Sequence, residues 1–189
     1  MSDVYSPEQR RLLLDTASRS IQHGFAHRQP WQVNLQEYPT LLQEIRNTFV
    51  TLYLHGEFQG CIGSLRPHAA LAQDVARNAF SAAYEDHRGP ALAEHNILSL
   101  KIQISVLHPP EAIAFDSEEN LIAKVRPGTD GLIVEENGRT GTLLPSVWEH
   151  LPDPGDFVRH VKLKAGLPSS YWSTSIRYLR YTTEAFSNE

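Results

Sequence analysis

The chain of 189 residues contains a single cysteine, Cys61. One cysteine excludes an internal disulfide, and it excludes every zinc cage that needs two or more thiolates. No stretch reaches the ~20 consecutive apolar residues of a membrane-spanning helix. The first residues lack the basic segment and apolar run of a signal peptide, so the sequence predicts a soluble, cytoplasmic protein.

Basic residues are fewer than acidic residues. The chain has 17 lysines and arginines against 22 acidic residues, which gives a net charge of −5 at pH 7. Proteins held on nucleic acid mainly by charge need a basic field, so this is the least favoured function class. The composition, 41% hydrophobic and 21% charged, is that of a globular protein. We expect a single domain over residues 1–189, with two interleaved lobes.

Capping signals and hydrophobic periodicity locate the expected helices. Ser6-Pro7-Glu8-Gln9 combines an N-cap hydroxyl, a first-turn proline and a glutamine that closes a capping box. Gly24 is the expected stop, because glycine adopts the left-handed C-cap conformation without penalty. We predict helices from Pro7 to Gly24, from Leu41 to Ile45, from Pro67 to Ala83, from Ser117 to Val125 and from Asp153 to Ala165.

Alternating and β-branched residues locate the expected strands. In Lys101 to Val106 the alternation is strict, so one face is apolar and the other polar. We predict further strands from Thr48 to Leu54, Phe58 to Ile62, Gly131 to Glu135, Arg139 to Leu144 and Ile176 to Phe186. His55-Gly56 and Asn137-Gly138 are turn signals that predict hairpins. The fold class is therefore α+β, with a mixed or antiparallel sheet flanked by helices.

The most distinctive local segment is Gly60-Cys61-Ile62-Gly63-Ser64, in which two glycines bracket the only cysteine. Glycine in a strand marks a bulge or a close approach of backbone. One interpretation is a nucleophilic or redox thiol near a helix N-terminus, where the dipole favours the thiolate. The other is a small buried side chain in a crowded strand. Spacing alone leaves both interpretations open.

Histidines and charged residues supply the remaining candidates. The chain has nine histidines but no His-Glu-x-x-His motif, and Gly24 separates His23 from His27 at the expected helix end. We predict no metal site and no cofactor. Asp86 and Arg88 follow a predicted helix and Asp130 precedes a strand, which are positions where loops carry function.

A basic turn closes the last predicted helix. It contains Arg159, His160, Lys162 and Lys164. Cations there are favoured by the helix dipole, so the first interpretation is structural and the second is anion binding through Lys164.

In four blocks the sequence resembles the AMMECR-one domain family, whose prokaryotic members are called AmmeMemoRadiSam system protein A. The resemblance runs from about Thr48 to Phe186. The blocks are Phe49-Val50-Thr51-Leu52, Gly60-Cys61-Ile62-Gly63, Gly131-Leu132-Ile133-Val134 leading to Leu143-Leu144-Pro145, and Lys164-Ala165-Gly166-Leu167-Pro168 followed by Trp172. Their order and spacing together make the resemblance specific.

The resemblance implies a compact α+β fold with a larger and a smaller lobe and the cysteine segment near their junction. It implies possible partners, Memo-like and radical SAM proteins, encoded nearby in many prokaryotes. It supplies no established reaction. The sequence departs from the family pattern at Phe58-Gln59, where Leu-Arg is typical, at His87 and Gly89, and at Asp130, where histidine is common.

These observations lead to one prediction and one alternative. We predict a binding cleft for a ligand or partner around Cys61, with Gly60, Gly63, Asp86, Arg88, Asp130 and Lys164 as its binding residues. The alternative is a cysteine-dependent enzyme with Cys61 as the catalytic nucleophile, a histidine as base and Arg88 or Lys164 holding an anionic substrate.

Overall fold

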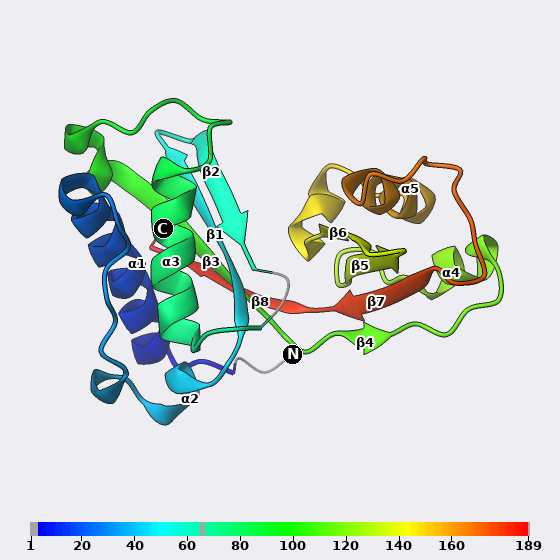
Figure 1. Cartoon of the computed structure of the whole chain (residues 1–189), viewed down its shortest axis with the longest axis horizontal. Coiled ribbons are helices and arrows are strands. Elements are labelled where there is room, and N and C mark those ends of the chain that lie inside the picture. Colours follow the sequence, from blue (N-terminus) through cyan, green and yellow to red (C-terminus); the bar gives the residue numbers. More distant parts are fainter. Residues whose placement is uncertain (1–3, 65–66, 189) are drawn as a thin grey trace. The chain divides into compact units, whose positions relative to one another are not determined.

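Two four-stranded antiparallel sheets and the helices packed on them form the computed structural model, which describes residues 4–64 and 67–188 (Figure 1). This arrangement confirms the α+β fold class. The chain divides into two compact units. The first unit runs up to Leu107 and takes in the stretch from Glu184 onward, and the second unit is His108–Thr183.

The first unit contains most of the helical residues. Its elements are α1 (Pro7–His27), a 3-10 turn (Leu35–Glu37), α2 (Thr40–Gln43), β1 (Asn47–Leu54), β2 (Glu57–Gly63), α3 (Leu71–Tyr84), a 3-10 turn (Glu94–Ser99), β3 (Leu100–Leu107) and β8 (Thr183–Ser187). The strand order is β2-β1-β3-β8. The long helices α1 and α3 cover one face of this sheet (Figure 1), where Val50, Leu52 and Ile104 are fully buried.

The second unit is built around a smaller core. Its elements are β4 (Glu111–Ala112), α4 (Glu118–Lys124), β5 (Gly131–Glu136), β6 (Arg139–Leu143), a 3-10 turn (Pro145–Glu149), α5 (Pro154–Lys164) and β7 (Arg177–Tyr181). The strand order is β4-β7-β5-β6. Trp148 and Phe157 stack with ring centroids 3.8 Å apart and anchor the core between the sheet and α5.

The expected capping and hairpin signals are confirmed. Ser6 Oγ accepts from the Gln9 backbone N–H at 3.2 Å, and the Gln9 side chain accepts from the Ser6 N–H at 2.9 Å. Asn137 and Gly138 both adopt positive φ between β5 and β6, as a two-residue hairpin turn requires. Most of the predicted elements agree with the structure to within about one residue at each end. They are the strands at 48–54, 58–62, 101–106, 131–135 and 139–144 and the helices at 117–125 and 153–165.

The prediction that α1 stops at Gly24 is wrong. The helix continues to His27, and Arg28 adopts the left-handed conformation (φ 58°) and donates its N–H to the Gly24 carbonyl. Gly24 instead allows close packing, because a Cβ there would lie 2.5 Å from the Phe80 ring. Glycine at this position is therefore required for packing against the neighbouring helix and not for ending α1.

Two other helix boundaries also differ. The helix expected from Pro67 begins at Leu71, because the chain just before it is extended and Ala70 forms a β-bridge with Ile45. For the same reason the short helix expected to reach Ile45 ends at Gln43. The single strand expected over 176–186 is two strands, β7 and β8, which belong to different sheets.

The break between β7 and β8 has a visible cause. Thr182 accepts the His108 backbone N–H at its carbonyl (2.9 Å), and its Oγ1 lies 2.8 Å from His108 Nδ1. This pairing takes Thr182 out of the ladders on either side and separates the two strands.

Candidate functional site

Cys61 lies on β2, the edge strand of the first sheet, opposite Thr51 on β1. Its side chain is half-buried. The Thr51 hydroxyl donates to Cys61 Sγ at 3.0 Å. The cysteine is therefore neither a deeply buried core residue nor a fully exposed thiol, and a neutral hydroxyl is one of its contacts.

Two charged side chains from the loop after α3 bind the main chain of Cys61. Asp86 Oδ2 accepts the Cys61 backbone N–H at 2.8 Å, and Arg88 Nη2 donates to the Cys61 carbonyl at 2.7 Å. The carboxylate and guanidinium thus occupy the hydrogen-bonding groups that an adjacent strand would use. We call this pair the Asp86–Arg88 clamp. It fixes the edge of β2 at Cys61.

The clamp is a strong ion pair. Arg88 donates to both carboxylate oxygens of Asp86, with Nη2–Oδ2 at 2.6 Å and Nε–Oδ1 at 2.9 Å. These hydrogen bonds hold the pKa of Asp86 far below its usual range, although burial of the carboxylate opposes the shift. The same bonds raise the pKa of Arg88. Both groups therefore stay charged at any physiological pH, and the clamp does not open by titration.

Glycines allow the clamp loop and α3 to approach β2. A Cβ at Gly60 would lie 2.1 Å from the Ala82 carbonyl oxygen of α3, and one at Gly89 would lie 2.0 Å from the Gln59 carbonyl oxygen. A Cβ at Gly63 would meet the Phe49 ring at 2.3 Å. Gly60 and Gly63, predicted as binding residues, thus have packing roles in the structure.

Two of the positions that depart from the family pattern, Phe58 and Gln59, have different environments. Gln59 is buried, and its amide donates to the Pro90 carbonyl, which ties β2 to the clamp loop. Phe58 is 39% exposed. The Arg88 guanidinium carbon lies 5.2 Å from the Phe58 ring centroid, and Tyr53 meets the same ring edge-on at 6.4 Å. We call Tyr53, Phe58 and Arg88 the aromatic–arginine patch.

Asp130 and Lys164 belong to the second unit. Asp130 is fully buried, accepts two hydrogen bonds from the Arg126 guanidinium at 2.6 and 2.9 Å, and holds the turn before β5. Lys164 is exposed at the end of α5. Of the predicted binding residues, the structure therefore brings together Gly60, Asp86 and Arg88 around Cys61, and the contacts described for Asp130 lie within the second unit.

Three polar residues that sequence reasoning missed are central to these units. Thr51 faces Cys61, Asp74 is fully buried on α3, and Lys162 is fully buried in the second unit. Thr51 lies opposite Cys61 only because a bulge at Gln59 shifts the strand register, and no signal in the sequence predicted that shift. Asp74 and Lys162 are charged residues of α3 and α5, and nothing in the local pattern distinguishes them from the exposed charged residues of a helix.

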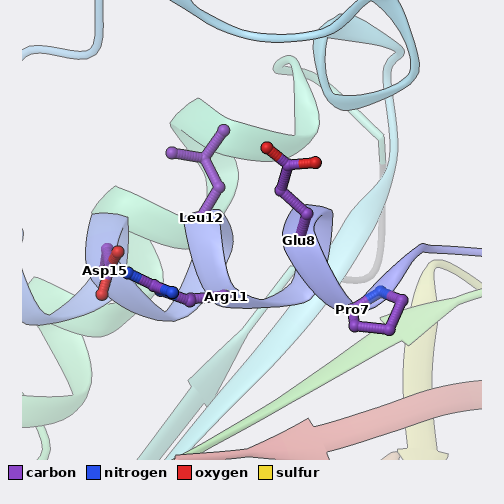
Figure 2. A pocket seen from close by; sticks show the side chains of 5 residues that line it. All are labelled: Pro7, Glu8, Arg11, Leu12 and Asp15. Atoms are coloured by element: carbon purple, nitrogen blue, oxygen red, sulfur yellow. The ribbon is translucent and has the colours of Figure 1, made fainter.

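Two hollows in the described part of the chain are lined by residues other than Cys61. Figure 2 shows the residues that line one of them along the first turns of α1, namely Pro7, Glu8, Arg11, Leu12 and Asp15. A second, of about 190 Å³, is lined by residues of the segment 30–33 together with Ala69, Gln73 and Arg77. The cleft predicted around Cys61 is therefore not among them, and what the structure shows at Cys61 is a clamped strand edge beside an exposed patch.

Comparison with known proteins shows similarity over most of the chain. The AMMECR1 family matches residues 14–186. A protein of Methanocaldococcus jannaschii is 33% identical over 82% of this chain and 79% of its own length, and one of Methanopyrus kandleri is 32% identical over 91% and 84%. A crystal structure of an uncharacterized protein from Pyrococcus horikoshii superposes with a TM-score of 0.89 at 30% identity, covering 97% of this chain and 93% of that one.

These relatives carry no functional assignment in their names. Within residues 4–64 and 67–188, no helix is long and apolar enough to cross a membrane. The family match extends the resemblance noted from Thr48 back to residue 14, so it includes most of α1. The chain belongs to the AMMECR1 family, the AMMECR-one domain family that its sequence resembles.

Proposed function

We propose that this protein is a cytoplasmic binding module that docks a partner protein through the aromatic–arginine patch beside Cys61. The observation that carries the proposal is the exposure of a structured patch: Phe58 is 39% exposed and the Arg88 side chain 60% exposed, and the two stack on each other. Aromatic residues and arginine dominate the energetics of protein interfaces.

The patch is held in place before any partner arrives. Asp86 and the Cys61 carbonyl fix the Arg88 guanidinium, and Tyr53 braces the Phe58 ring. A side chain that is already ordered loses less conformational entropy on binding, so more of the contact energy appears as affinity. Because Asp86 neutralises Arg88, the patch favours an aromatic or apolar partner surface over an acidic one.

The family resemblance suggests which partners to test. It implies Memo-like and radical SAM proteins as possible partners, and we propose these as the proteins that dock on the patch. In this reading, Cys61 and its two bracketing glycines position the clamp, and the clamp positions the patch.

The test is a quantitative binding assay. We expect the double variant Phe58→Ala/Arg88→Ala to bind the Memo-like or the radical SAM protein at least about tenfold more weakly, the loss typical of a single interface hot spot. The matched control is Ile45→Ala, because Ile45 is 59% exposed but precedes β1, whereas Tyr53 and Phe58 lie at the far end of the β1–β2 hairpin. If the natural chain binds neither protein, or if the double variant binds as well as the control, the proposal is wrong.

One observation favours a second candidate function, chemistry at the Cys61 thiol. The Thr51 hydroxyl donates to the sulfur at 3.0 Å, and a donated hydrogen bond stabilises a thiolate relative to a thiol. A cysteine-dependent enzyme would use such a thiolate as its nucleophile.

Alkylation kinetics test this candidate. If Cys61 is activated, iodoacetamide modifies it faster than it modifies a peptide containing Gly-Cys-Ile-Gly, and Thr51→Val slows the reaction severalfold while Thr51→Ser does not. Mass spectrometry of the intact protein follows the reaction. A rate equal to that of the peptide, unchanged in Thr51→Val, would remove the enzyme hypothesis and leave the binding proposal intact.

A further inference from the structure

We propose that His23 and His27 form a two-histidine site for a divalent transition metal on the last turn of α1. The sequence placed a helix stop between them, but the helix runs through Gly24 and ends after His27. Residues four apart in a helix lie on the same face, one turn above the other. The continuation of α1 therefore brings the two imidazoles together.

The two rings are already adjacent and parallel. Their centroids are 4.0 Å apart and their planes differ by 10°. Zn–N bonds are about 2.0–2.1 Å long, so two nitrogens on one tetrahedral zinc ion lie roughly 3.3 Å apart. The lone pairs of two parallel rings lie in parallel planes and do not converge on one point, so metal binding requires a change of side-chain rotamer at His23, which is half-buried, or at His27, which is exposed.

One ring of the pair is oriented by a backbone carbonyl. His27 Nδ1 lies 3.1 Å from the His23 carbonyl oxygen. A carbonyl can only accept, so Nδ1 carries the hydrogen and Nε2 of the neutral ring presents its lone pair. In protein metal sites the ring nitrogen that does not bind the metal usually donates to a carbonyl or carboxylate in this way, which orients the ligating imidazole.

The position on the helix also favours a cation. His27 lies in the last turn of a 21-residue helix and His23 one turn before it, near the end where the aligned peptide dipoles place partial negative charge. Imidazole suits zinc, copper and nickel, which are the metals we expect here. Within the described parts of the chain no set of three or more histidine, cysteine or acidic side chains is placed to hold a metal, so water completes the coordination of this site.

Titration of the untagged full-length protein with Ni²⁺ and with Zn²⁺ tests the site. We expect isothermal titration calorimetry to detect one site, and we expect His23→Asn and His27→Asn each to weaken it by at least about tenfold, the lower limit for loss of even a supporting group around a metal. Long-range ¹H–¹⁵N spectra of the imidazoles show whether Zn²⁺ shifts the signals of these two rings first.

His160 provides the matched control. It lies on α5 and makes the same Nδ1 contact to a carbonyl four residues earlier, to Asp156 at 2.8 Å, but its neighbours at that spacing are Asp156 and Lys164 rather than a second histidine. His160→Asn should leave the affinity unchanged. The proposal is overturned if the natural chain shows no such site, if either single variant binds as tightly as the natural chain, or if His160→Asn causes the same loss.

Discussion

Replacing Asp74 by alanine is expected to lower the free energy of unfolding of the first unit by at least about 3 kcal/mol, because it leaves several buried donors without an acceptor. Asp74 is fully buried on α3. Its Oδ2 accepts from the Thr48 backbone N–H at 2.9 Å, from Thr48 Oγ1 at 2.7 Å and from Asn78 Nδ2 at 2.9 Å. Each buried donor that loses its partner costs about 1–3 kcal/mol.

The other carboxylate oxygen ties the cysteine strand to the helix. Asp74 Oδ1 accepts from Ser64 Oγ at 2.9 Å and from Arg77 Nη2 at 3.1 Å. Ser64 closes the Gly60–Ser64 segment, and its backbone N–H bonds to the Thr48 carbonyl. The loss of Asp74 should therefore loosen the end of β2 as well as the start of α3.

Hydrogen exchange read by mass spectrometry checks both statements in the full chain. We expect amides of β1, the end of β2 and α3 to exchange faster in Asp74→Ala, while amides of β5 and α5 in the second unit keep their protection. Asp15→Ala, which removes an exposed carboxylate from α1, is the control and should change little. Equal protection in Asp74→Ala and Asp15→Ala would contradict the anchoring role.

Local signals were enough to predict most of this fold. The capping box at Ser6, the Asn137-Gly138 turn and the alternation over Lys101 to Val106 each rest on neighbours in the chain, and each is confirmed. The errors at Gly24, Pro67 and the break between β7 and β8 have a shared cause. In each case the missing information is a contact with a residue far away in sequence: the Phe80 ring that requires glycine at position 24, the bridge between Ile45 and Ala70, and the pairing of His108 with Thr182.

The environment of Cys61 depends on one inserted residue. The two-residue turn at His55-Gly56 pairs Tyr53 with Phe58, and a regular ladder from there would place Cys61 opposite Val50, on the face covered by helices. Instead Gln59 is an extra residue, so that Leu52 pairs with Gly60 and Thr51 pairs with Cys61. A bulge shifts the register by one and moves every later side chain to the opposite face. No signal in the sequence resolved this, so the interpretations of Cys61 as a reactive thiol and as a small buried side chain both stayed open.

The local sequence pattern also did not predict which charged side chains are buried. Lys162 belongs to a basic turn that we interpreted as a helix end interacting with its dipole, yet its side chain is fully buried. Its Nζ donates to Glu118 Oε2 at 2.7 Å and to the Ser169 carbonyl at 3.0 Å. The lysine thus joins α5, the first turn of α4 and the loop that follows α5. A charged residue in a helix looks the same in sequence whether its partner is water or a carboxylate 44 residues away.

Glu118→Ala is therefore expected to destabilise the second unit by about 3–5 kcal/mol, the cost of leaving a buried charge without its partner. The Glu118 side chain is 28% exposed, whereas Lys162 has no exposure, so removing the carboxylate leaves the ammonium in a site where water does not reach it. Glu119→Ala is the matched control, because Glu119 is the next residue of the same helix turn and is exposed.

The double variant Glu118→Ala/Lys162→Met separates the charge from the packing. Methionine keeps most of the volume of the lysine side chain and needs no counter-charge, and replacing a whole buried ion pair by apolar side chains is often neutral or stabilising. We expect the double variant to recover most of the stability lost in Glu118→Ala, as measured by denaturant unfolding and by exchange of the α5 amides. If the double variant is as unstable as Glu118→Ala alone, the loss comes from the packing of α4 and not from the stranded ammonium. If Glu118→Ala matches Glu119→Ala, the ion pair contributes nothing to holding α4 against α5.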